Sequence, residues 1–143
     1  MDMVTLTIDE RPVQARAGVT VLEAADAAGV YIPRLCSHPD LPTAKSLTPV
    51  EFVYRGDQRF DRDGRGAEFE GCRLCIVQVA GRPEFLRACN TLVELGMVVH
   101  TDTPEVRARR QDNFAPLLAH HPHACLTCAQ REGCSRTQCS ANV

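Results

Sequence analysis

Eight cysteines in 143 residues constrain this chain more than any other feature. Four of them form two C-x-x-C pairs, Cys72 with Cys75 and Cys125 with Cys128. The N-terminus has neither a basic region nor a long apolar run, so we expect no secretory signal and a cytoplasmic location. Because disulfides are rare in that reducing compartment, the cysteines are best interpreted as metal ligands. Buried apolar cysteines could explain one or two of the eight, but not both pairs.

Composition argues against two other classes of partner. The net charge is −2, Trp is absent and aromatic residues are few, which gives no field suited to nucleic acid. No apolar stretch approaches the length needed to cross a bilayer. We therefore expect no nucleic-acid partner and no direct membrane insertion.

The N-terminal residues predict a β-hairpin followed by a helix. Residues 4–8 and 13–16 alternate between apolar and polar side chains, and the four residues between them are typical of a turn. Thr20 and Glu23 then have the spacing of a capping box, which predicts a helix over residues 21–28.

The later part of the chain predicts three more strands and a second helix. The strands are expected at residues 76–79, 85–89 and 97–100. Thr103 and Pro104 supply an N-cap and a first-turn proline for the helix, and Pro116 is expected to kink or end it. This pattern predicts an α+β fold.

Two short segments that contain aromatic residues lie in a polar stretch in the middle of the chain. Residues 51–54 and 58–60 flank Arg55, Gly56 and Asp57, which predicts a small hairpin on an exposed excursion.

A first group of cysteines offers four thiolates from loops and a strand end. Cys36 follows the first predicted helix, Cys72 and Cys75 precede a strand, and Cys89 follows that pair after 13 intervening residues. Thiolates are the usual ligands of iron-sulfur clusters. A C-x-x-C pair also occurs in zinc sites and in thioredoxin-like redox motifs, but a thioredoxin motif leads into a helix rather than a strand. Zinc remains open as an alternative.

At this point the sequence resembles a known family over nearly its whole length. It is similar to the N-terminal ferredoxin domain of the large iron-sulfur subunit of complex I, which also occurs in NAD-linked and iron-only hydrogenases and in NAD-linked formate dehydrogenases. The resemblance rests on the runs TVLEAA from Thr20, IPRLCSHP from Ile32, GCRLCIV from Gly71, ACNT from Ala88, GMVV from Gly96 and TDTPEVR from Thr101.

The resemblance implies a β-grasp 2Fe-2S ferredoxin domain at residues 1–102, with Cys36, Cys72, Cys75 and Cys89 as ligands of the 2Fe-2S cluster. The gap of 35 residues between Cys36 and Cys72 is much longer than is usual in the family. We interpret residues from about 43 to 70 as an insertion. A long surface loop adds little closure entropy, so the insertion leaves the ligand assignment intact.

A second group of ligands lies in the C-terminal segment, residues 103–143, after the second helix. His121, Cys125, Cys128 and Cys134 spell H-x3-C-x2-C-x5-C, which in the family holds a 4Fe-4S cluster with one histidine ligand. Cys139 is a further thiol, and we keep it as an alternative or extra ligand. The expected segment is therefore a helix followed by a small His/Cys tail.

The residues suggest no substrate-converting site, so electron transfer is the leading hypothesis. The resemblance implies partners on both sides: a flavin-containing subunit that handles NAD(P)H and a catalytic oxidoreductase subunit. One alternative is a zinc-stabilised structural or interaction module that uses Cys72, Cys75, Cys125 and Cys128. Another is a redox or iron sensor, which would need an output domain.

Overall fold

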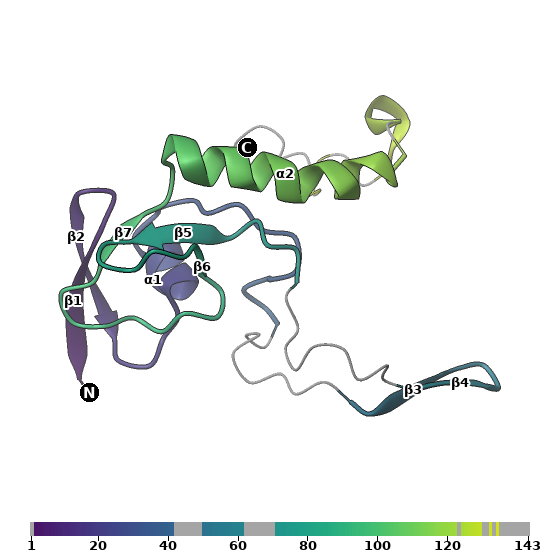
Figure 1. The fold of residues 1–143 in the computed structure, drawn as a ribbon, viewed down its shortest axis with the longest axis horizontal. Coiled ribbons are helices and arrows are strands. Elements are labelled where there is room, and N and C mark those ends of the chain that lie inside the picture. The colour runs from purple at the N-terminus through teal and green to yellow at the C-terminus, as the bar shows by residue number, and fades with distance from the viewer. Residues whose placement is uncertain are drawn as a thin grey trace.

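The computed structural model describes residues 2–41, 50–61, 71–122, 124–129, 132 and 134. Figure 1 shows a small body of mixed sheet and helix, with a long helix running along one side of it. The elements in chain order are β1 (Met3–Ile8), β2 (Arg11–Arg16), α1 (Val21–Ala27), β3 (Phe52–Arg55), β4 (Gln58–Asp61), β5 (Ile76–Val79), β6 (Leu86–Arg87), β7 (Val98–His100), α2 (Pro104–Ala119) and a 3-10 turn (Cys125–Thr127).

The N-terminal hairpin is confirmed, but its turn is shorter than predicted. Strands β1 and β2 pair in antiparallel register from Met3 opposite Arg16 to Ile8 opposite Arg11. Only Asp9 and Glu10 lie between them, with φ of 47° and 66°. Two left-handed residues give the turn the twist that a two-residue hairpin requires.

The predicted capping box at the start of α1 is present. The Glu23 backbone N–H donates to the Thr20 hydroxyl, and the Thr20 backbone N–H donates to the Glu23 carboxylate at 2.6 Å. At the other end the chain leaves the helix through Gly29, whose φ of 71° suits glycine. Helix α1 is therefore fixed at both ends by local sequence, and it buries Val21, Leu22, Ala24 and Ala25 in the core.

Five strands form the main sheet in the order β2-β1-β7-β5-β6. Strand β7 runs parallel to β1 and antiparallel to β5, so the sheet is mixed. Leu6, Ile8, Val77 and Val99 are almost fully buried between this sheet and the rest of the core. The expected α+β class is confirmed. The three later strands lie within the predicted residues, but β6 is shorter than the predicted strand at residues 85–89 and covers only Leu86–Arg87.

Helix α2 begins as predicted, with the Thr103 hydroxyl accepting from the Val106 backbone N–H at 3.1 Å. Residues Val106, Arg110 and Phe114 form its buried stripe at a spacing of four. The prediction that Pro116 could end the helix is wrong, because the helix continues to Ala119. A proline lacks the N–H that would donate to a carbonyl one turn earlier. In the exposed last turn this loss costs the helix little stability, because both the proline ring and that carbonyl face water.

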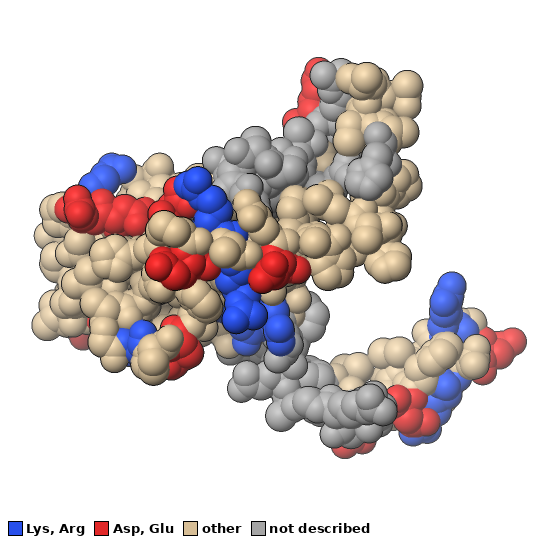
Figure 2. All heavy atoms as spheres, turned by 45° about the horizontal axis from the view of Figure 1, so that its top comes forward, with Lys and Arg blue, Asp and Glu red and all other residues tan. Residues whose placement is uncertain are grey.

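The predicted central hairpin is also present. Strands β3 and β4 pair in antiparallel register, and every residue of both strands is exposed. Figure 1 shows this hairpin away from the main sheet. Figure 2 shows acidic and basic side chains close together on the hairpin and on the body, so the face in view has mixed charge.

Within the described residues, none of the helices is long and apolar enough to span a membrane.

Candidate metal centre

Three segments that are distant in sequence bring four cysteines together. Cys36 lies in the loop after α1, Cys72 and Cys75 lie in the loop that leads into β5, and Cys89 follows β6. The Ala88 backbone N–H donates to the Cys75 carbonyl at 2.9 Å, and the Leu22 N–H donates to the Ala88 carbonyl at 3.0 Å. The last strand pair and α1 together therefore position Cys89 next to Cys75.

The first two cysteines form one sulfur pair. The Cys36 thiol donates to the Cys72 sulfur, which lowers the pKa of Cys72 to about 5 and raises the pKa of Cys36. The Leu35 backbone N–H also lowers the pKa of Cys72 by donating to its sulfur at 3.4 Å. The Cys72 backbone N–H donates to the Cys36 sulfur at 3.5 Å, which partly opposes the raised pKa of Cys36. The opposite pKa shifts of the two thiols have one main cause, the hydrogen bond that joins their sulfurs.

The other two cysteines form a second pair, and this pair is buried. The Cys75 thiol donates to the Cys89 sulfur, which lowers the pKa of Cys89 and, together with burial, raises the pKa of Cys75. Cys75 is 2% exposed and Cys89 is 6% exposed. Each cysteine of one pair also interacts electrostatically with the other pair.

Two adjacent pairs of thiols fit a binuclear centre, in which each metal ion takes two protein sulfurs. Within the described residues no group of three or more His, Cys, Asp or Glu side chains could hold one metal ion. The zinc hypothesis combined Cys72 and Cys75 with Cys125 and Cys128. The structure does not support that combination, because Cys72 and Cys75 have Cys36 and Cys89 as their sulfur partners.

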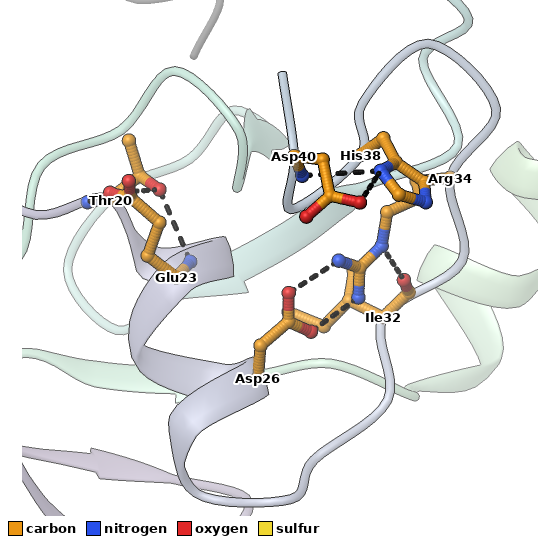
Figure 3. Close-up of polar contacts among 7 residues, drawn as sticks. All are labelled: Thr20, Glu23, Asp26, Ile32, Arg34, His38 and Asp40. Atoms are coloured by element: carbon orange, nitrogen blue, oxygen red, sulfur yellow. Dashed lines mark hydrogen bonds and ion pairs between the residues drawn. The ribbon is translucent and has the colours of Figure 1, made fainter. Parts of the chain in front are cut away.

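The loop that carries Cys36 is attached to α1 by an arginine. Both terminal nitrogens of Arg34 donate to the Asp26 carboxylate, and its Nε donates to the Ile32 carbonyl at 3.1 Å (Figure 3). Such a two-pronged contact fixes orientation as well as distance. Beyond the cysteine, the Asp40 N–H donates to Nδ1 of His38 and closes the turn (Figure 3).

A hollow of about 70 Å³ lies between α1 and this loop. Arg34, His38 and Cys89 are among the residues that line it.

The loop before β5 has a backbone shaped for its sulfurs. Gly71 and Arg73 both have positive φ, 65° and 55°. Arginine rarely adopts this conformation, which is strained without glycine and is common at functional sites. The Leu74 N–H also donates to the Cys72 sulfur. Hydrogen bonds of this type stabilise a negatively charged cluster.

Three arginines place positive charge around the sulfurs. Arg34 and Arg110 interact with Cys75, and Arg87 lowers the pKa of Cys89 further. The sequence did not single out Arg110 as functional. The signal that could have found it is its position between Val106 and Phe114 in a stripe of spacing four that is otherwise apolar.

Among the described residues, the predicted ligands of the second cluster form no group of three or more that could hold a metal ion. His121 lies just after α2 and is exposed, Cys125 begins the 3-10 turn, and Cys128 ends it. Cys134 is half-buried. Cys139 lies outside the described residues.

Comparison with known proteins agrees with this geometry. Residues 1–46 and 49–104 match the family described as 2Fe-2S iron-sulfur cluster binding domain. The chain belongs to this family. The match covers all four cysteines of the two pairs, and it confirms the resemblance that the sequence motifs indicated.

Similar proteins are subunits of larger oxidoreductases. The chain is 33% identical over 131 residues to the mitochondrial NADH-ubiquinone oxidoreductase 78 kDa subunit of Candida albicans, covering 92% of this chain and 15% of that protein. It is 31% identical over 134 residues to the NADP-reducing hydrogenase subunit HndD of Solidesulfovibrio fructosivorans, covering 94% of this chain and 20% of that protein.

A solved structure supports the same relationship. The crystal structure of an NAD+-reducing [NiFe]-hydrogenase in the H2-reduced state matches with a TM-score of 0.68 and 29% identity, covering 96% of this chain and 48% of the matched chain. The chain thus spans a fifth or less of the two curated relatives.

Proposed function

We propose that this chain is an electron-transfer unit whose 2Fe-2S cluster is bound by Cys36, Cys72, Cys75 and Cys89. The convergence of two thiol pairs from three distant segments supports this most directly. We assign Cys36 and Cys72 to one iron and Cys75 and Cys89 to the other, because the sulfurs already lie in these pairs. Iron-sulfur clusters exchange single electrons, and soft thiolate ligands suit them.

The proposal includes a 4Fe-4S cluster in the C-terminal segment, bound by His121, Cys125, Cys128 and Cys134. The spacing of these residues supports it, as does their place at the end of α2. Because metal binding and local folding are coupled, we propose that the cluster itself draws the four side chains together. Cys139 remains an alternative or additional ligand. On this proposal, residues 1–102 form the β-grasp ferredoxin domain and residues 103–143 form the second cluster segment.

The relatives suggest what such a unit would connect. They are subunits of NADH-ubiquinone oxidoreductase and of NADP-reducing hydrogenase. We propose that the clusters pass electrons between a flavin-containing partner that handles NAD(P)H and a catalytic oxidoreductase partner, in the cytoplasm.

Two substitutions test the assignment of ligands. Cys75→Ser should abolish the 2Fe-2S signal in low-temperature EPR and leave the 4Fe-4S signal, because the two ligand sets come from separate segments. Cys128→Ser should do the reverse, and each variant is the control for the other. Loss of both signals in either variant without unfolding, or loss of neither, would contradict this partition of ligands.

A further inference from the structure

Arg110 is a charged residue in an unusual place. It lies in the middle of α2 and is 2% exposed, although arginine is rarely fully buried unless it is paired. Among the described residues no carboxylate forms an ion pair with it. Two carboxylates act on Arg110 electrostatically without contacting it, and both have closer partners: Asp102 pairs with Arg107 at 2.8 Å, and the Asp9 carboxylate accepts from the backbone N–H and the hydroxyl of Thr101.

The guanidinium of Arg110 instead contacts the backbone on both sides of Cys75. Its Nε donates to the Leu74 carbonyl at 2.9 Å, and one terminal nitrogen donates to the Ile76 carbonyl at 2.7 Å. Nearly one turn further along α2, Nδ2 of Asn113 donates to the Arg73 carbonyl at 2.9 Å. Helix α2 thus holds three of the four carbonyls between residues 73 and 76.

These carbonyl contacts set the direction of the amide groups in the loop. In a trans peptide the C=O of one residue and the N–H of the next point in opposite directions, and no cis peptide occurs in the described chain. With the Arg73 and Leu74 carbonyls turned towards α2, the N–H groups of Leu74 and Cys75 point away from it. The Leu74 N–H does reach the Cys72 sulfur. Such N–H groups favour the reduced, more negative cluster.

We propose that Arg110, assisted by Asn113, is a positioning residue of the 2Fe-2S centre. Arg110 holds the C-x-x-C loop so that the loop's N–H groups are directed at the sulfurs, and the guanidinium supplies a buried positive charge beside the cluster. This inference rests on the proposed ligand set. It also gives α2 a function in the first site, in addition to carrying the second group of ligands.

The test is the reduction potential of the 2Fe-2S cluster in the cluster-loaded full chain, measured by EPR-monitored redox titration. Arg110→Gln removes the charge and should lower the potential by at least 59 mV, a tenfold change in the ratio of oxidised to reduced cluster. Arg110→Lys keeps the charge but loses the paired N–H donors that reach the Leu74 and Ile76 carbonyls. The cluster potential of R110K should therefore lie between those of R110Q and the wild type. Arg109→Gln is the matched control, because Arg109 is an exposed neighbour on α2 that stacks near Phe85. Its potential should not change.

An R110Q potential equal to those of the wild type and R109Q would overturn the inference. If R110Q retains too little cluster to titrate, Asn113→Ala decides the question. It should lower the potential by less than R110Q would and in the same direction, and an unchanged value would overturn the inference. Failure of the proposed function is a different result, because the wild type itself would then show no 2Fe-2S signal.

Discussion

Phe114 connects α2 to the cysteine loop through apolar packing, and we expect its removal to destabilise the fold strongly. Its side chain is 4% exposed and packs with Leu74, which is fully buried, beside Leu35, Cys72 and Leu118. Truncating a buried phenylalanine to alanine typically costs 3–5 kcal/mol. Since three of its neighbours are only partly buried and can close in on the space, we expect Phe114→Ala to cost about 3 kcal/mol.

The assay is urea unfolding of the cluster-loaded chain under anaerobic conditions, followed by far-UV circular dichroism. For a domain of this size the free energy of unfolding falls by about 2 kcal/mol per molar urea. The urea concentration at the unfolding midpoint should therefore fall by about 1.5 M. Leu117→Ala is the control on the same helix. Its side chain is 40% exposed, and we expect a cost of about 1 kcal/mol or less. Equal midpoint shifts in the two variants would refute the argument that α2 is held to the loop through Phe114.

Three further predictions concern the local features of the site and its support. Thr20→Ala removes the capping box and should lower the free energy of unfolding by about 1 kcal/mol, seen as a Tm about 5 °C lower. Thr20→Ser keeps the hydroxyl and should retain most of the wild-type stability. Arg73→Gly should raise the Tm because it removes left-handed strain of about 1 kcal/mol, and Arg73→Ile should lower it; the reverse order would contradict the strained backbone. In the metal-free chain, iodoacetamide should alkylate Cys72 before the more exposed Cys36. Because the pKa of Cys72 is lowered to about 5, its labelling should persist as the pH falls from 8 to 6 and fade only near pH 5; peptide mass spectrometry that finds Cys36 labelled first would contradict this.

Local sequence signals predicted the elements that local physics determines. The Thr20 and Glu23 capping box, the N-cap at Thr103 and the central hairpin depend on residues a few positions apart, and each is present. The N-terminal turn was predicted as four residues, because Pro12 is typical of a turn. Proline is tolerated in β2 because β2 is an edge strand of the sheet.

Features that depend on tertiary packing could not be predicted in this way. The order of the strands in the sheet and the pairing of Cys36 with Cys72 across 35 residues follow from the whole fold. Arg110 is similar: a charged residue on a helix normally faces water, and only the carbonyls of the loop explain its burial. The second ligand set is proposed to be drawn together by its own cluster, and a geometry that depends on metal binding does not follow from local sequence patterns.

The most direct test of the central claim is the content of iron, zinc and acid-labile sulfide in anaerobically purified chain, combined with low-temperature EPR after reduction by dithionite. The account predicts about six irons per chain and two distinct cluster signals, one from each ligand set. About one zinc per chain, with neither iron nor sulfide, would show that the cysteines build a structural zinc site and would contradict the electron-transfer account.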